Sequence, residues 1–234
     1  MTERSGRLDV GVVGAGRVGP VLAAGLAGAG HRIAGVATTS SVGRDRVEAL
    51  LGAAPILDLP TLLARSDLVV LAIPASEIAP LVGGLAEAGH WRAGTLLAHT
   101  AAELGTAVLR PAVERGAIPL AIHPAIVFTG TSLDLVRLRD AVCAVTAPAP
   151  VLPIAQALVV ELGAEPVVIA EDDRPAYAEA VATATAFSAS IVGQSLDILA
   201  RIGVERPGGV VAPLIRSSVD EALRVAPPPA DSAG

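Results

Sequence analysis

A glycine-rich string near the start of the chain constrains the fold more than any other feature. Residues 14–19 read Gly-Ala-Gly-Arg-Val-Gly, directly after the apolar run Leu8–Val13 and directly before a helix-forming stretch. In that context the first glycine allows a tight turn, the second lets the backbone approach a pyrophosphate, and the third lets the helix pack closely. The N–H groups and dipole of the helix attract the phosphates. The string therefore predicts a dinucleotide-binding turn made of Gly14, Ala15, Gly16, Arg17, Val18 and Gly19, the alternative being a glycine-rich turn without a ligand.

Strand-like and helix-like segments alternate through the first two thirds of the chain. The expected strands are Leu8–Val13, Arg32–Ala37, Ile56–Leu57, Asp67–Ile73, Thr95–His99, Ile118–Ile122, Val142–Thr146 and Pro166–Ile169. The expected helices are Val18–Ala29, Arg44–Leu51, Glu77–Ala88, Leu104–Arg115 and Pro153–Leu162. Nearly continuous apolar strands in such an alternation predict an α/β fold with a doubly wound parallel sheet, covered by helices on both faces.

Beyond Pro148 the pattern becomes mostly helical. An acidic turn and Pro175 begin an alanine-rich helix that runs to Ala200, and a second helix is expected over Val211–Arg224. Residues 181–196 carry no charge, so we expect this helix to be buried against a second copy of the chain. The predicted domains are 1–148, which binds the dinucleotide, and 149–225, which binds substrate and forms a homodimer, followed by a disordered tail over 226–234.

Composition excludes several classes of function. The net charge of −6 and the pI near 5.2 argue against nucleic-acid and anionic-membrane partners, which require clustered positive charge. A lone cysteine, Cys143, cannot form an intramolecular disulfide or a thiolate metal site, and no metal is expected. All 17 basic residues are arginine and asparagine is absent, which excludes a lysine base, a lysine Schiff base and an asparagine clamp. The polar start shows no secretory signal and prolines interrupt the uncharged run after Ala141, so we expect a cytoplasmic protein.

The end of the second expected strand indicates which nicotinamide cofactor binds. NAD sites usually place an Asp or Glu there, about 20 residues past the glycine turn. This chain has Thr38, Thr39 and Ser40 instead, with Arg44 and Arg46 just beyond. Hydroxyl donors and a guanidinium suit a 2′-phosphate, which favours NADP(H) over NAD(H). The alternative is that these residues cap a helix and face solvent.

Further candidates lie where other strands end, at the edge where ligands bind in such sheets. Ile73, Pro74 and Ala75 are expected to line the cofactor. His99 and His123 each end a strand, and imidazoles are the best acid–base candidates in a chain without lysine. The alternative is that both are buried rings bonded to the backbone. His31 and His90 fall in turns and are expected to be solvated.

Three segments carry a resemblance to a known group of proteins. They are His99-Thr100, the stretch from Gly116 through His123-Pro124 to Phe128-Thr129-Gly130, and Leu162–Pro166 with Asp172-Asp173-Arg174. The chain resembles the Rossmann-like proteins that carry a C-terminal domain of unknown function numbered 2520, relatives of pyrroline-5-carboxylate reductase, ketopantoate reductase, prephenate dehydrogenase and 6-phosphogluconate dehydrogenase. The resemblance covers nearly the whole chain, which looks like a short form. It implies a Rossmann domain that binds NADP(H) and a small helical domain that dimerises and covers the nicotinamide.

The chain differs from these relatives mainly in its second half. Where they tend to read His-Thr-Ser-Gly and Tyr-His, it has alanines after Thr100 and after Tyr177, and it cannot have their Ser-Asn pair. We expect an NADP(H)-dependent oxidoreductase of a small oxo acid or imine, in which His123 or His99 donates the proton. Substrate contacts are expected from Thr100, Arg174 and Tyr177, with an arginine holding a carboxylate. The alternative is a catalytically silent nucleotide-binding regulatory or scaffold protein of the same fold.

Overall fold

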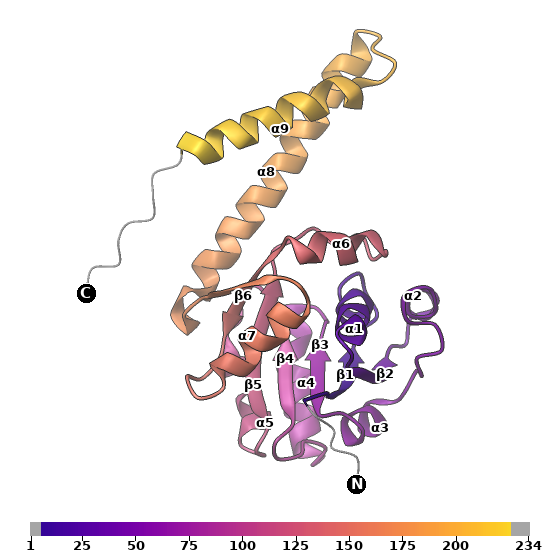
Figure 1. Cartoon of the computed structure of the whole chain (residues 1–234), viewed down its shortest axis with the longest axis vertical. Coiled ribbons are helices and arrows are strands. Elements are labelled where there is room, and N and C mark those ends of the chain that lie inside the picture. Colours follow the sequence, from indigo (N-terminus) through magenta and orange to yellow (C-terminus); the bar gives the residue numbers. More distant parts are fainter. Residues whose placement is uncertain (1–5, 226–234) are drawn as a thin grey trace, which may run out of the picture. The chain divides into compact units, whose positions relative to one another are not determined.

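The computed structural model describes residues 6–225, and a seven-stranded sheet forms the centre of its larger part (Figure 1). The strands are β1 (Asp9–Val13), β2 (Arg32–Ala37), β3 (Leu68–Leu71), β4 (Leu96–His99), β5 (Ile118–Pro124), β6 (Val142–Thr146) and β7 (Glu165–Val168). Their order across the sheet is β2-β1-β3-β4-β5-β6-β7. The predicted α/β fold with a doubly wound sheet and a following helical region is confirmed.

Helices connect the strands and cover both faces of the sheet (Figure 1). The helices are α1 (Gly19–Gly28), α2 (Ser41–Leu51), α3 (Leu59–Ala64), α4 (Ala75–Glu87), α5 (Arg110–Val113), α6 (Leu133–Arg139), α7 (Leu152–Glu161), α8 (Arg174–Arg201) and α9 (Pro207–Val225), with 3-10 turns η1 (Thr106–Leu109) and η2 (Glu171–Asp173). Successive residues of a strand face opposite sides, so Leu68 and Val70 of β3 join one core while Val69 and Leu71 join the other. Both cores are apolar, which explains why the strands read as unbroken apolar runs.

The sheet is mostly parallel, but β6 runs antiparallel to β5. The sequence analysis predicts a parallel sheet throughout, so this pairing is a correction. The physical reason is the connection between the two strands. The segment from Ala125 to Ala141 contains only the short helix α6, and β6 starts beside the end of β5, with Ala125 N donating to Val142 O at 2.9 Å. The connection therefore returns the chain to the edge where β5 ends, and a strand that starts there pairs with β5 in the antiparallel direction.

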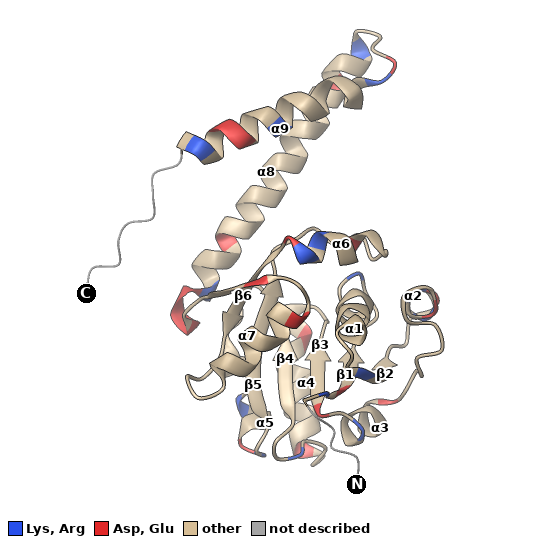
Figure 2. Ribbon diagram, viewed as in Figure 1, with Lys and Arg blue, Asp and Glu red and all other residues tan. Residues whose placement is uncertain are grey.

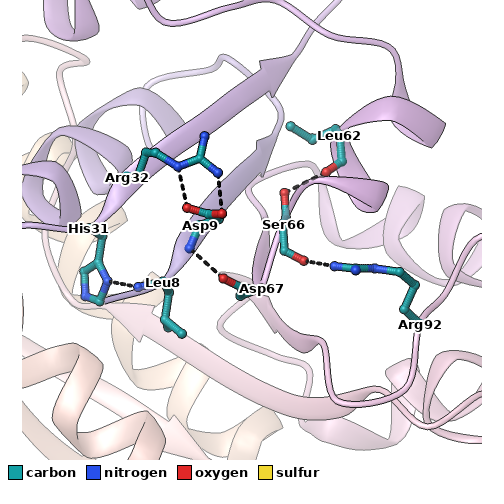
Figure 3. Close-up of polar contacts among 8 residues, drawn as sticks. All are labelled: Leu8, Asp9, His31, Arg32, Leu62, Ser66, Asp67 and Arg92. Carbon is teal, nitrogen blue, oxygen red and sulfur yellow. Dashed lines mark hydrogen bonds and ion pairs between the residues drawn. The ribbon is translucent and has the colours of Figure 1, made fainter. Parts of the chain in front are cut away.

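Polar contacts fasten the amino ends of the strands, opposite the edge where ligands bind (Figure 3). The Asp9 carboxylate accepts from Arg32 Nε at 2.5 Å, and Asp9 N donates to Asp67 Oδ2 at 3.0 Å, which ties β1 to β2 and to the start of β3. His31 is buried, in contrast to the solvated ring expected from sequence. Its Nδ1 accepts from Leu8 N at 3.0 Å because the turn after α1 folds back onto β1.

One predicted helix differs from its expected form. The helix expected over Leu104–Arg115 is divided into η1 and α5, with Pro111 in the first turn of α5. The chain divides into two compact units after Glu179. The boundary at residue 148 between a dinucleotide-binding part and a substrate-binding part stays a prediction. Helix α7 packs on β6, and β7 extends the sheet through β6, so both belong to the first unit.

The second unit, described as far as residue 225, consists of α8 beyond Glu179 and α9. The uncharged stretch expected to be buried is exposed in the single chain, and Figure 2 shows how few charges α8 carries. The second unit exposes large apolar side chains, among them Phe187, Ile191, Ile198, Ile202, Leu214 and Leu223. Among the described helices, none is long and apolar enough to cross a membrane. The predicted tail, residues 226–234, lies outside the described residues.

Candidate functional site

The turn between β1 and α1 has the geometry that its three glycines predict. Gly14 has a φ of +101°, and a Cβ there would collide with the carbonyl oxygen of Ala72 in the neighbouring strand connection. A Cβ on Gly19 would collide with the carbonyl oxygen of Gly14, so the third glycine lets α1 approach the turn. A Cβ on Gly16 would meet no atom within 4 Å. Gly16 therefore leaves open space above the backbone, where a ligand can approach.

The start of α1 is suited to an anion. Val18 occupies the N-cap position and makes no side-chain capping bond, and within this described helix the first turn holds no acidic residue. The N–H groups of the first turn therefore have no side-chain cap, and the helix dipole is not neutralised by a carboxylate. Backbone donors with this dipole fit the pyrophosphate of a dinucleotide.

A cleft of about 620 Å³ opens on one side of the turn. Its lining brings together four predicted residues, Gly14, Thr38, Thr39 and Ile73, and it also includes Asp58. The Asp58 carboxylate accepts from Thr61 N at 2.7 Å and caps α3. Pro74 and Ala75, predicted to line the cofactor, instead begin α4 beyond the lining residues.

The polar residues after β2 have separate roles. Ser40 Oγ accepts from Gly43 N at 3.2 Å, so Ser40 caps α2, as the alternative interpretation of the sequence holds. Arg44 is exposed in the first turns of α2. Arg46, two residues later, donates from Nη1 to Ala15 O at 2.8 Å and braces the glycine turn. The sequence did not predict this contact, because it depends on how α2 packs against the glycine turn.

A second cavity of about 280 Å³ lies on the other side of the turn. It is lined by Arg17, Val18, Thr100, His123, Pro124, Ile126 and Phe128. Four of these are predicted site residues, contributed by the glycine turn, the end of β4 and the end of β5. Ile126 and Phe128 were not predicted as site residues. They line the cavity because the loop after β5 folds over it instead of extending away.

His123 is the histidine that faces this cavity. Its Nδ1 lies 2.9 Å from the hydroxyl of Tyr177, and the two rings meet edge to face with centroids 5.6 Å apart. Burial, together with the Arg174 charge, lowers the pKa of His123 to about 4 against an opposing effect of Glu103. The imidazole is therefore neutral at neutral pH.

His99 has a different environment. It is fully buried, Nε2 lies 2.8 Å from Gly105 O, and Nδ1 accepts from Ala101 N at 3.3 Å. Because a carbonyl only accepts and an N–H only donates, Nε2 carries the proton. Burial lowers its pKa to about 4. With both nitrogens bonded to the backbone, the ring shapes the loop after β4 and has no nitrogen left for a substrate.

Arg174, predicted to hold a substrate carboxylate, is fully buried at the start of α8. Its Nη2 donates to Ala121 O at 2.9 Å and to Ala144 O at 3.3 Å, and its Nε donates to Thr146 Oγ1 at 2.7 Å. The guanidinium carbon lies 5.9 Å from the centroid of the Tyr177 ring. Arg174 therefore joins β5 to β6 beneath Tyr177 and lines neither of the two cavities.

Two carboxylates that the sequence did not single out hold the loops around the site. Asp134 is fully buried and accepts from Thr129 N at 2.8 Å and from Gly130 N at 2.7 Å, which fixes the loop that carries Phe128. Glu171 accepts from the backbone of Thr106 and of Ala107, both at 2.8 Å. These bonds and their neighbours lower the pKa of each carboxyl against the effect of burial. Across residues 6–225, no group of three or more His, Cys, Asp and Glu side chains could hold a metal ion.

Solved structures with the same fold include several oxidoreductases. A candidate NADP oxidoreductase from Bacteroides fragilis aligns with a TM-score of 0.74 at 19% identity, over 94% of this chain and 82% of that one. Pyrroline-5-carboxylate reductase from Streptococcus pyogenes aligns with a TM-score of 0.71 at 18% identity, over 96% and 83%. Pyrroline carboxylate reductase from Plasmodium falciparum, solved with NADP bound, aligns with a TM-score of 0.67 at 14% identity, over 94% and 80%. At these identities the likeness shows the fold.

Comparison with protein families assigns both halves of the chain. No curated protein matches the sequence significantly. A Rossmann-like domain family matches residues 2–124, which include the glycine turn, both cavities' strand ends and His123. The domain of unknown function 2520 matches residues 141–232. The chain therefore belongs to the family of Rossmann-like proteins that carry this C-terminal domain.

Proposed function

We propose that the protein is an NADP(H)-dependent oxidoreductase that acts on a small oxo acid or imine. The observation that carries the proposal is the pair of cavities on either side of the glycine turn. The larger one offers hydroxyl donors from Thr38 and Thr39, and the smaller one offers Arg17, Thr100 and His123. A dinucleotide laid across the N-terminus of α1 reaches from one to the other.

The residues present fit such a cofactor. The open space at Gly16 and the first turn of α1 would hold the pyrophosphate, and Arg17 would neutralise part of the anionic charge there. When bound, the reduced nicotinamide supplies the hydride. The apolar side chains of Ile126 and Phe128 line the smaller cavity and would shield a bound nicotinamide from part of the solvent, which strengthens electrostatic interactions there.

His123 is the proposed partner of the reacting oxo or imine group. Reduction of a C=O or C=N bond places negative charge on the oxygen or nitrogen, which a hydrogen-bond donor stabilises and then protonates. His123 lines the cavity, whereas both nitrogens of His99 are bonded to the backbone. We therefore assign the proton-donating role to His123, whose ring then regains a proton from solvent, and a structural role to His99.

The preference for NADP(H) rests on Thr38, Thr39 and Arg44. No acidic residue lies at the end of β2, and the nearby Asp58 carboxylate is engaged as the cap of α3. Replacing Thr39 and Arg44 together with alanine should weaken NADPH binding about tenfold while changing NADH binding little. Fluorescence titration of both nucleotides measures this, and unchanged discrimination would reject these residues as the 2′-phosphate site.

The activity itself is tested in two steps. NADPH binding is measured by fluorescence, and NADPH oxidation is then followed with a panel of 2-oxo acids and cyclic imines. Turnover that disappears in the His123→Gln variant supports the proposal, with His90→Gln as the matched control at a histidine remote from the cavities. Tight binding without turnover favours the catalytically silent alternative, and absence of NADPH binding rejects both.

We also propose that the protein is a homodimer through its helical region. Within residues 180–225 only Val211 is buried, while Phe187, Ile191 and Ile198 are each at least half exposed. An apolar surface of this kind, on a helix that carries no charge over residues 181–196, is typical of a protein–protein interface, and a second copy of the chain can pack against it through the same surface.

A further inference from the structure

We propose that Tyr177 is a positioning residue that donates its hydroxyl hydrogen to His123 Nδ1 and so fixes the ring as the Nε2–H tautomer. Only the catalytic role of this hydrogen bond rests on the proposed function; the bond itself and the tautomer do not. The 2.9 Å contact joins the first turn of α8 to the end of β5, far apart in sequence. Tyr177 is the one tyrosine in the chain, so no other phenol can replace it.

The direction of the hydrogen bond follows from the groups around it. If Nδ1 carried the proton, Tyr177 would act as the acceptor and its own O–H would need another acceptor. Within the part of the chain that the structure describes, the phenol oxygen has no second hydrogen-bond partner. With Tyr177 as donor, Nδ1 is satisfied and the proton of the neutral ring lies on Nε2. Nε2 is then free to face the cavity that His123 lines.

Arg174 strengthens the same arrangement. Its guanidinium carbon lies 5.9 Å from the centroid of the Tyr177 ring, one helical turn away on α8. A buried cation disfavours a second positive charge on the neighbouring imidazole and draws negative charge toward the phenol oxygen. Burial raises the pKa of Tyr177, which keeps the hydroxyl protonated and able to donate.

The start of α8 is held rigidly enough to impose this geometry. Arg174 bonds to the carbonyl oxygens of Ala121 and Ala144, in two neighbouring strands. Just before the helix, Glu171 bonds to the backbone at the start of η1. Tyr177 therefore approaches His123 from a helix end anchored to the sheet on one side and to the loop after β4 on the other.

The consequence concerns how His123 acts. A neutral imidazole with its proton on Nε2 serves as a hydrogen-bond donor to developing negative charge, without an imidazolium being formed first. The charged and titratable groups around His123 are Arg174 and Tyr177 from α8, Glu103 from the loop after β4, and Arg17 from the glycine turn. Only Glu103 among them favours a protonated ring.

Nuclear magnetic resonance of the full chain labelled with [15N]histidine tests the proposal without cofactor or substrate. The four histidines give few signals, and His123→Gln identifies that of His123, with His90→Gln as the control. At pH 7 we expect His123 as a neutral ring with its proton on Nε2. A ring with its proton on Nδ1, or an imidazolium, would overturn the proposal.

The Tyr177→Phe variant provides the second measurement. Loss of the donated hydrogen bond should raise the pKa of His123 by about one pH unit, the equivalent of one neutral hydrogen bond, and allow both tautomers. Thr185→Val removes a hydroxyl from the same helix and should leave His123 unchanged. An unchanged His123 signal and pKa in Tyr177→Phe would overturn the proposal, and if this variant does not fold, the tautomer of the unmodified protein still decides. Failure of NADPH to bind bears only on the proposed function.

Discussion

Replacing Gly14 with alanine should destabilise the protein strongly. The φ of +101° lies in a region that costs a non-glycine residue about 1–3 kcal/mol. The new Cβ would also collide with the carbonyl oxygen of Ala72 and lie 3.0 Å from Ile73 Cγ2. Because a backbone carbonyl in a sheet connection cannot move freely, overpacking adds about 1–3 kcal/mol, for a total of about 4 kcal/mol. In a chain of this length that corresponds to a fall of about 10 °C in Tm.

The matched control is the same substitution two residues later. A Cβ on Gly16 meets no atom within 4 Å, so Gly16→Ala should leave the free energy of unfolding within about 0.5 kcal/mol of the unmodified protein. It should nevertheless weaken NADPH binding at least about tenfold, because the methyl group fills the space that the pyrophosphate needs. Urea denaturation followed by circular dichroism measures stability, and fluorescence titration measures binding. A Gly14→Ala variant as stable as the unmodified protein, or a Gly16→Ala variant that binds NADPH normally, would refute the reasoning.

Three further predictions concern other parts of the molecule. Asp134→Ala should lower the free energy of unfolding by about 3 kcal/mol, because it removes the acceptor of two backbone N–H groups. Asp134→Asn keeps one oxygen for these groups and should lower it by about 1 kcal/mol. Urea denaturation measures both variants, and equal costs would contradict this explanation. Between pH 6.5 and about 4 stability should fall as pH falls, because His99 and His123, with pKa values of about 4, stay neutral in the folded protein while the unfolded chain binds their protons. The slope of the free energy of unfolding against pH should reach about 2.7 kcal/mol per pH unit for two protons and roughly halve in His123→Gln. Midpoints of urea denaturation that do not depend on pH would reject this explanation. Phe187→Glu should convert a dimer to a monomer in sedimentation experiments, since it places a charge on the exposed apolar surface, and an unchanged sedimentation coefficient would place the interface elsewhere.

The architecture of the first unit was largely predictable because its signals are local. Buried parallel strands are apolar throughout, and the glycine turn that follows β1 needs glycine for reasons that involve neighbouring backbone atoms. Even the short strand at Ile56 was expected and pairs with Val36. The direction of β6 was not predictable in this way, because it depends on the path that the preceding connection takes. The burial of α8 against a second copy stays a prediction, since a helix without charges shows only that some surface must cover it.

The residues of the candidate site were likewise predictable only in part. Sequence alone placed Thr38, Thr39 and Thr100 at the ends of strands, and the structure finds each of them on a cavity wall. The sequence could not assign separate roles to His99 and His123, because both lie at the end of a strand. Nor could it show that Arg174 is buried, because an arginine beside two acidic residues at a helix start is normally solvated.

By itself, then, the sequence determined the strand–turn–helix unit, the alternation of elements and which residues lie where the strands end, because each depends on residues close together in the chain. The tertiary structure alone decided which imidazole keeps a free nitrogen. His99 loses both of its nitrogens to a loop six residues away or less, whereas His123 is bonded to Tyr177 on a helix that follows two strands later. Hydrogen bonds between distant segments exist only once the sheet has brought those segments together, and they leave no local pattern in the sequence.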